Sequence, residues 1–227
     1  MRVLAIDTAL EACAAAVLDT EHGRVASESL PMERGHAEAL MPLIAQVMRQ
    51  ADMPFTALDR VAVTTGPGSF TGLRVGISAA RGIALAANKP AFGLTTLAAF
   101  AAPYIADDSK SGVAVAIDAR HNHVYLQVFA PGGRTLVHPR IASLEDAIRA
   151  AKTHGPVRII GTGANMIAAA WPEREPPPAA FEDKRAPDIV WVGRLAVAAA
   201  ENAGPPRPLY LRAPDAQPQD AARLPRR

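Results

Sequence analysis

The feature that most constrains this chain is a glycine-rich run, which reads TTGPGSFTGLRVGISAARG over residues 64–82. The three residues before it, Val61 to Val63, are short, apolar and mostly β-branched, which favours a buried parallel strand. Gly66, Gly68 and Gly72 can adopt backbone angles closed to other residues. Ser69 or Thr71 could cap the stretch of small residues that follows. The run therefore predicts a strand, a tight turn and a helix in direct succession.

Such a turn can bind an anion, because the free N–H groups and the dipole of the helix point the same way. The alternative is a strand-to-helix connection that binds nothing. The run is neither a phosphate-binding loop ending in Gly-Lys-Ser/Thr nor a dinucleotide-binding fingerprint, since its residues and glycine spacing differ. Ser69 directly follows Gly68, so the Gly-x-Ser-x-Gly arrangement of a hydrolase nucleophile is absent.

The chain reads as two halves with the same order of elements. The polar stretch at residues 107–112 separates them, and Val113 to Ala119 then repeats the pattern of Val3 to Thr8, an apolar strand ending in Asp. We expect a first subdomain at 1–106, a second and reduced one at 107–204, and a partly disordered tail at 205–227. The helix predicted from Asp188 to Asn202 could belong to the second subdomain or pack back on the first.

Periodicity and turn residues place the remaining elements. An apolar stripe from Leu40 to Ala51 predicts a helix, and Thr95 or Thr96 and Ser143 can cap two more. The predicted strands are 3–7, 12–18, 24–29, 60–64 and 90–94 in the first half, and 113–119, 123–129, 135–137 and 157–160 in the second.

Composition narrows the class of protein. Of 227 residues, 49% are hydrophobic but only 5% are aromatic, which is poor material for stacking the bases of single-stranded nucleic acid. The net charge is +2, and the single cysteine, Cys13, lies in an apolar segment, which indicates a buried thiol in a reducing compartment. Without a signal-peptide pattern or a long apolar stretch, we expect a soluble, cytoplasmic protein with no membrane partner.

The stretch GPGSFTGLRVGISAARGIA resembles the signature of the bacterial TsaB (YeaZ) family, part of the glycoprotease-like group, and the resemblance runs from Met1 to about Arg212. It implies an α/β fold of the actin, sugar-kinase and Hsp70 type, with two ribonuclease-H-like subdomains facing a cleft. The repeat of the two halves agrees with that fold.

Asp7 and Asp118 close the first strand of each half. The resemblance implies that they occupy the phosphate-binding positions of a vestigial nucleotide cleft, together with Gly66, Gly68 and Ser69. Each carboxylate could instead cap a strand-to-turn connection, and for Asp118 the neighbours Arg120 to Asn122 favour a turn.

The histidine His36 is relevant to whether this chain could bind a metal ion. The related catalytic protein TsaD carries two histidines at i and i+4 on one helix, where both rings can hold a single metal ion. The matching positions here are His36 and Leu40, and one imidazole with a leucine makes no metal site. We therefore expect no metal or cofactor of its own, with ATP and Mg²⁺ acting only in a complex, and we expect His36 to pack or form a hydrogen bond where its helix begins.

The resemblance also implies a partner surface, in which the first two helices pair with the equivalent helices of TsaD. The candidate contacts are His36, Leu40, Leu43, Val47, Leu73, Ile77 and Arg81. The alternative is that both helices only cover the sheet of their own subdomain. The same face could support a homodimer when the partner is absent.

The resemblance implies a non-catalytic subunit that stabilises TsaD during formation of threonylcarbamoyladenosine in tRNA. TsaE would bind the assembled pair, and contact with tRNA would be indirect. The rival hypothesis is an autonomous nucleotide-dependent phosphohydrolase or phosphotransferase that uses Asp7, Asp118 and the glycine turn. A protease using Ser69 ranks behind both. The string Pro208 to Arg212 resembles the closing motif of the family, and we expect it to pack on the body of the protein.

Overall fold

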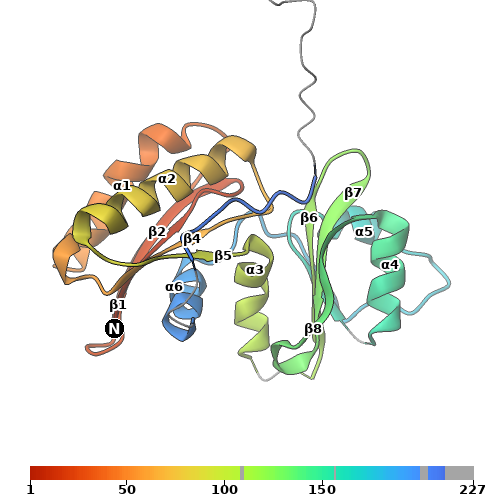
Figure 1. Ribbon diagram of the computed structural model, residues 1–227. Helices are drawn as coiled ribbons and strands as arrows, with labels where there is room; N and C mark the ends of the chain where they lie inside the picture. Colours follow the sequence, from red (N-terminus) through yellow and green to blue (C-terminus); the bar gives the residue numbers. More distant parts are fainter. Residues whose placement is uncertain (108–109, 156, 200–203, 213–227) are drawn as a thin grey trace, which may run out of the picture.

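The computed structural model describes residues 1–107, 110–155, 157–199 and 204–212. Within these residues the strands form two five-stranded sheets (Figure 1). The first sheet has the order β3-β2-β1-β4-β5, with β1 antiparallel to β2 and parallel to β4. Its strands are β1 (Arg2–Asp7), β2 (Ala12–Asp19), β3 (Arg24–Pro31), β4 (Arg60–Thr64) and β5 (Ala91–Leu94).

The second sheet repeats this topology in the order β8-β7-β6-β9-β10, with β6 antiparallel to β7 and parallel to β9. Its strands are β6 (Gly112–Asp118), β7 (His123–Phe129), β8 (Thr135–Ser143), β9 (Val157–Ile160) and β10 (Ala180–Glu182). The internal repeat predicted from the two apolar strands that end in Asp is therefore confirmed, because β1 and β6 occupy the same place in the two sheets.

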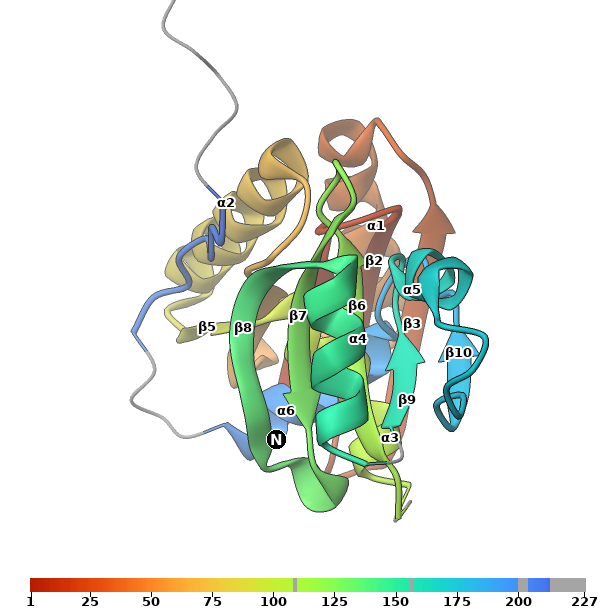
Figure 2. The ribbon, with the colours of Figure 1, turned by 90° about the vertical axis from the view of Figure 1, so that its right-hand side faces the viewer.

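The helices lie in three layers around these sheets (Figures 1 and 2). Helices α1 and α2 cover one face of the first sheet, α4 and α5 cover the outer face of the second, and α3 and α6 lie between the sheets. Their bounds are α1 (His36–Gln50), α2 (Phe70–Ala87), α3 (Thr96–Ile105), α4 (Leu144–Thr153), α5 (Ala164–Ala170) and α6 (Ile189–Ala198), with 3-10 turns at Phe55–Ala57 and Pro131–Gly133.

Side-chain oxygens cap four of the helices as the sequence suggested. Ser69, Thr95, Ser143 and Asp188 each accept a hydrogen bond from a backbone N–H in the first turn of the helix that follows. These bonds satisfy donors that have no partner within the helix, so local sequence decides where the helices begin.

The two helices between the sheets pack on different sheets. Helix α6 packs through Ile189, Val192 and Ala196 on the first sheet, although it comes last in the chain. Helix α3 packs through Leu97 and Phe100 on the inner face of the second sheet. The segment predicted as the end of the second subdomain thus packs back on the first, which is one of the two placements considered above.

Several predicted bounds differ from the structure. Strand β8 runs six residues beyond the predicted 135–137, and β10 was not predicted, because its three residues carry no periodic pattern. Helix α6 ends at Ala198, and residues 200–202 of the predicted helix lie outside the described residues. The predicted packing of Pro208 to Arg212 on the body is confirmed, since Leu209 bonds to Thr65, and residues 213–227 of the predicted tail lie outside the described residues. In the described part of the chain, no helix is both long and apolar enough to cross a membrane.

Candidate functional site

The glycine-rich run forms the predicted strand, turn and helix, and its turn packs against the residues that follow β1. The backbone N–H of Ser69 donates a hydrogen bond to the carbonyl oxygen of Ala9 at 2.7 Å. The hydroxyl of Thr8 donates to the carbonyl oxygen of Gly72 at 2.7 Å. The ends of β1 and β4 and the start of α2 are therefore joined in one junction.

The glycines of the run are required by this close packing. A Cβ at Gly68 would overlap the carbonyl oxygen of Ala9, and one at Gly72 would overlap that of Thr8. At Gly76 it would overlap the Thr8 hydroxyl. Backbone carbonyl oxygens, which repel an anion, thus lie against the faces of Gly68 and Gly72. The geometry supports the strand-to-helix connection, and the anion-binding role of Gly66, Gly68 and Ser69 stays a prediction.

Asp7 lies fully buried where β1 ends. Its Oδ1 accepts hydrogen bonds from the Thr64 hydroxyl and from the Ala9 amide, the latter at 3.2 Å. Its Oδ2 has no hydrogen-bond partner in the described part of the chain. Burial raises the pKa of this carboxyl to about 6, although the hydrogen bonds from Thr64 and Ala9 and the charge of His36 oppose the rise. Asp7 is thus a carboxylic acid whose charge changes near neutral pH.

Cys13 is close enough to Asp7 to sense its charge. Burial, and then the Asp7 carboxylate, raise the pKa of the thiol to about 11. A thiol with this pKa remains protonated at neutral pH, and the thiolate is the nucleophile in cysteine chemistry. The prediction that the thiol is buried is confirmed.

Asp118 closes β6 but lies in a different environment, exposed in the turn between β6 and β7. Its carboxylate accepts a hydrogen bond from the amide of Arg120 at 2.7 Å, and its own amide donates to the Thr162 hydroxyl at 2.9 Å. Arg120, His121 and Asn122 all have positive φ, at 63°, 53° and 57°. These are the contacts of a turn, and a role of Asp118 in binding nucleotide stays a prediction.

His36 is the first residue of α1, and its side chain points inward. Its Nε2 lies 3.0 Å from the carbonyl oxygen of Leu10, and because a carbonyl can only accept, this nitrogen donates. The predicted hydrogen bond at the start of the helix is confirmed. Leu40, where the resemblance predicts the counterpart of a TsaD histidine, is 1% exposed and belongs to the core.

The predicted partner contacts need correction. Leu40, Leu43, Val47, Leu73 and Ile77 are all between 0% and 4% exposed in the core between α1, α2 and the first sheet, and His36 is 8% exposed. Side chains already packed inside the chain present no area to a partner in this conformation. The stripe of apolar residues was the inward face of each helix, as is usual for helices that cover a sheet. Of the predicted set, only Arg81 is exposed.

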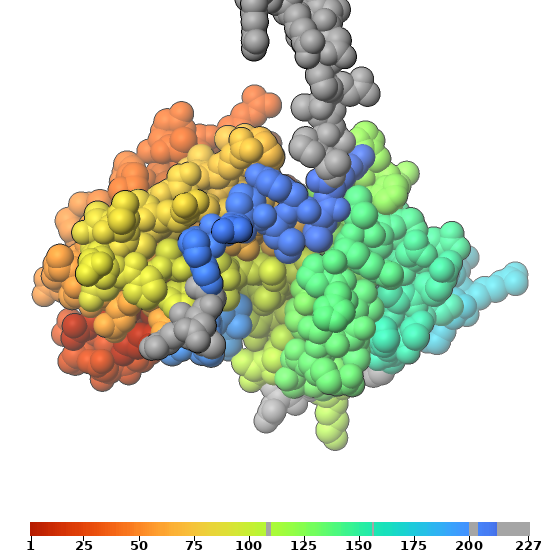
Figure 3. All heavy atoms as spheres, viewed as in Figure 1, coloured from red at the N-terminus to blue at the C-terminus, as the bar shows by residue number. Residues whose placement is uncertain are grey.

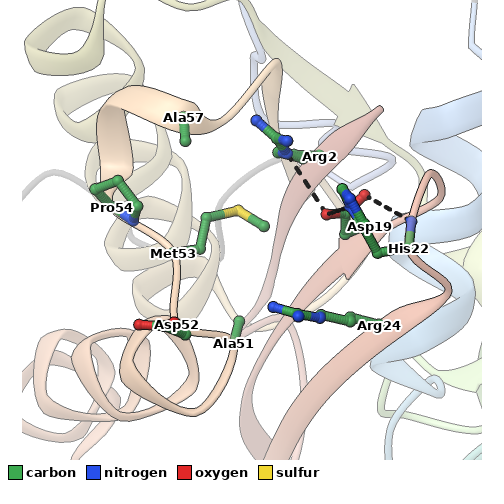
Figure 4. A pocket seen from close by; sticks show the side chains of 9 residues that line it. All are labelled: Arg2, Asp19, His22, Arg24, Ala51, Asp52, Met53, Pro54 and Ala57. Atoms are coloured by element: carbon green, nitrogen blue, oxygen red, sulfur yellow. Dashed lines mark hydrogen bonds and ion pairs between the residues drawn. The ribbon is translucent and has the colours of Figure 1, made fainter.

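A pocket of about 240 Å³ lies at the opposite end of the first sheet and was not predicted (Figure 4). Asp19, 5% exposed, lies between the side chains of Arg2, at 3.5 Å, and His22, at 2.8 Å. Burial opposes ionisation of Asp19, but hydrogen bonds from the His22 ring and from the Glu21 and His22 amides outweigh it and lower its pKa to about 2. The residues are adjacent in space because β1 and β2 pair, a relationship that no local motif reveals.

Asp19, Glu21 and His22 also bring three possible cation ligands within 4.8 Å of one another. The terminal ammonium of Met1 lies 3.1 Å from Glu21, and Arg2 contacts both carboxylates. Positive charge is therefore already supplied by the chain, and the cluster is a network of ion pairs.

Two α/β units of identical strand order, stacked with helices between them, define a protein of the actin-like fold. A glucokinase of the ROK family from Streptomyces griseus has the same fold, with a TM-score of 0.51 at 11% identity over 88% of this chain and all of that one. The model of the family "TsaD: tRNA N6-adenosine threonylcarbamoyltransferase" matches residues 30–217. The chain belongs to this family and, within it, to the TsaB (YeaZ) branch.

Individual relatives of this chain are named TsaB or YeaZ. The TsaB protein of Haemophilus influenzae, a "tRNA threonylcarbamoyladenosine biosynthesis protein", is 31% identical over 174 residues, which cover 72% of each chain. The TsaB protein of Escherichia coli is 38% identical over 125 residues, and this match spans 55% of the present chain and about half, 53%, of that protein. The structure of YeaZ from Pseudomonas aeruginosa superposes with a TM-score of 0.78 at 27% identity, covering 92% of this chain and 99% of that one.

Proposed function

We propose that this chain is a non-catalytic subunit in the formation of threonylcarbamoyladenosine in tRNA, and that it binds and stabilises a catalytic subunit of the TsaD type. The names of its relatives support the pathway. In this role the chain acts in the cytoplasm, and TsaE binds the assembled pair. ATP, Mg²⁺ and tRNA engage the complex rather than this chain alone.

The observation that carries the non-catalytic role is the pair His36 and Leu40. A site built from two histidines needs both rings free to coordinate a metal ion. Here the Nε2 of His36 donates to the Leu10 carbonyl, and Leu40 is packed in the core. Leu40 carries no ligand atom and is packed in the core, so the pair cannot supply the two imidazoles of such a site. In this proposal a partner supplies the metal and the transfer chemistry.

The outward faces of α1 and α2 support a partner surface. On α2, exposed Phe70, Arg74, Ser78, Arg81 and Leu85 recur at spacings of three and four residues and so share one face. Leu85 is 83% exposed and, on α1, Met41 is 49% exposed. Large apolar side chains that project from helices into water are suitable anchors for another protein.

The test is to mix the chain with the TsaD protein of the same organism and to measure mass by size-exclusion chromatography with light scattering. We expect a heterodimer, weakened by Met41→Glu and by Leu85→Glu. Val25→Glu provides the matched control, because Val25 is also apolar and 52% exposed but belongs to strand β3 rather than to either helix. Circular dichroism of each variant establishes that it is folded.

Independent elution of the two wild-type proteins at micromolar concentration would contradict the proposal. In that case turnover of Mg-ATP by the isolated chain, abolished by Asp7→Ala, would favour the rival enzyme. Equal weakening by Val25→Glu would contradict the placement of the surface on α1 and α2 without contradicting the partnership itself.

A further inference from the structure

The last described residues, 204–212, cross from one α/β unit to the other. The backbone N–H of Leu209 donates a hydrogen bond to the carbonyl oxygen of Thr65 at 2.7 Å. The amide of Thr65 in turn donates to the carbonyl oxygen of Leu94, the last residue of β5. The segment therefore lies directly beside the turn of the glycine-rich run.

Two glycines make room for this segment. A Cβ at Gly66 would lie 2.8 Å from the carbonyl oxygen of Leu209, and one at Gly93 would lie 3.2 Å from the Cα of Pro206. Pro206 is buried. The segment therefore lies in close contact with the backbone of the first unit at Gly66 and Gly93.

An aromatic stack anchors the segment to the start of α2. The rings of Tyr210 and Phe70 are stacked with centroids 5.5 Å apart. The guanidinium of Arg74 lies 3.8 Å from the centroid of Phe70, and its Nε donates to the Tyr210 hydroxyl at 3.4 Å. Aromatic stacking and cation–π contacts of this geometry are both attractive, so they hold Tyr210 at the start of α2.

The far end of the segment contacts the second unit. The side chain of Leu211 packs on the core cluster that α3 forms with β6, which includes Leu97 and Ile117. The guanidinium of Arg212 donates to the carbonyl oxygen of Ala119 at 3.0 Å, at the base of the turn whose next three residues have positive φ. In the space-filling view the segment, in blue, lies over the junction between the yellow and green parts of the molecule (Figure 3).

We propose that residues 205–212 act as a clasp that holds the two α/β units at one fixed angle. One end is seated on the glycine-rich run and α2, and the other on the turn between β6 and β7. Because each end contacts a different unit, a change in the angle between the units must break the contacts at one end. The proposal does not depend on the proposed function, since it concerns the isolated chain.

The test measures the angle directly in the full chain. Spin labels are attached to Gln50→Cys on α1 and Ala169→Cys on α5, two exposed positions in different units, while native Cys13 is buried and protected from the label. Pulsed electron resonance gives the distance distribution between the labels. The clasp variant is Tyr210→Ala with Arg212→Ala, and the matched control is Arg207→Ala, an exposed arginine of the same segment.

We expect a single narrow distribution for the wild type and the control, and a shifted, broader one for the clasp variant. Hydrogen exchange of the Leu209 amide should become at least about ten-fold faster in the clasp variant. Leu209→Pro, which removes that donor, should broaden the distribution as well. Unchanged distributions in both variants, with circular dichroism showing that they are folded, would overturn the clasp, whether or not Leu209 exchange changes.

Discussion

The hydroxyl of Thr64, at the end of β4, donates a hydrogen bond to Oδ1 of Asp7, at the end of the neighbouring parallel strand β1. Oδ2 of the same carboxyl has no partner among the described residues. The junction that holds the glycine-rich run therefore contains a buried acid that is better accommodated neutral than charged.

Asp7→Asn should remove a pH dependence of stability. Folding raises the pKa of Asp7 from 3.8 to about 6, so the folded state holds this proton more tightly than the unfolded chain does. The resulting contribution to the free energy of unfolding is complete below about pH 4 and is lost as the pH rises through 6. Relative to the Asn variant, which keeps an oxygen for Thr64, the wild type should lose about 3 kcal/mol of unfolding free energy across this range. Urea denaturation at several pH values measures the difference. If the free energy of unfolding changed with pH in the same way for both proteins, the raised pKa of Asp7 would be contradicted.

Gly72→Ala and Gly82→Ala should change stability in opposite directions. A Cβ at Gly72 would overlap the carbonyl oxygen of Thr8, whereas one at Gly82 meets nothing within 4 Å. We expect Gly72→Ala to lower the free energy of unfolding by about 2 kcal/mol or more, because backbone must move. Gly82→Ala should raise it by about 0.5–1 kcal/mol, since alanine favours the helix. Thermal unfolding of both variants distinguishes these outcomes, and similar effects would show that the junction is not tightly packed.

On α1, Leu43→Ala should lower the free energy of unfolding much more than Met41→Ala does. Leu43 is 2% exposed and Met41 is 49% exposed. Truncation of the buried side chain should cost about 2–5 kcal/mol of unfolding free energy. Truncation of the exposed one should change it by less than about 0.5 kcal/mol. Chemical denaturation provides the measurement. A large loss of stability for Met41→Ala would mean that its side chain also packs within the chain.

Arg60→Lys should weaken the attachment of α6 to the first sheet. The buried guanidinium of Arg60 donates to the carbonyl oxygens of Ala196 and Ala199, at 2.6 and 3.0 Å, where α6 ends. It also lies 4.4 Å from the centroid of the Phe92 ring. Both bonds come from Nη1, and a lysine is shorter and lacks the flat guanidinium that lies over Phe92, so we expect a loss of about 1–3 kcal/mol. Exposed Arg49→Lys is the control, and amide exchange in α6 should accelerate only in the Arg60 variant.

The order of elements, the internal repeat and most helix starts can be predicted from the amino-acid sequence. These features depend on local preferences. Ser69, Thr95 and Ser143 cap the helices that immediately follow them, and apolar strands are recognisable from their own residues. The family resemblance of the glycine-rich run is likewise visible without coordinates, and so is the expectation it implies that Leu40 stands in place of a second histidine.

Which face of each helix or strand is buried, and against what, depends on how the elements pack in three dimensions. The apolar stripe of α1 was compatible with a partner or with the chain's own sheet, because hydrophobic burial is not directional, and only packing shows that Leu43 and Val47 lie in the core. The contacts of Asp19 with Arg2, of Arg60 with α6 and of Leu209 with Thr65 join residues far apart in sequence or on separate elements. No local pattern encodes such pairs, because the free energy that forms them comes from the assembled fold.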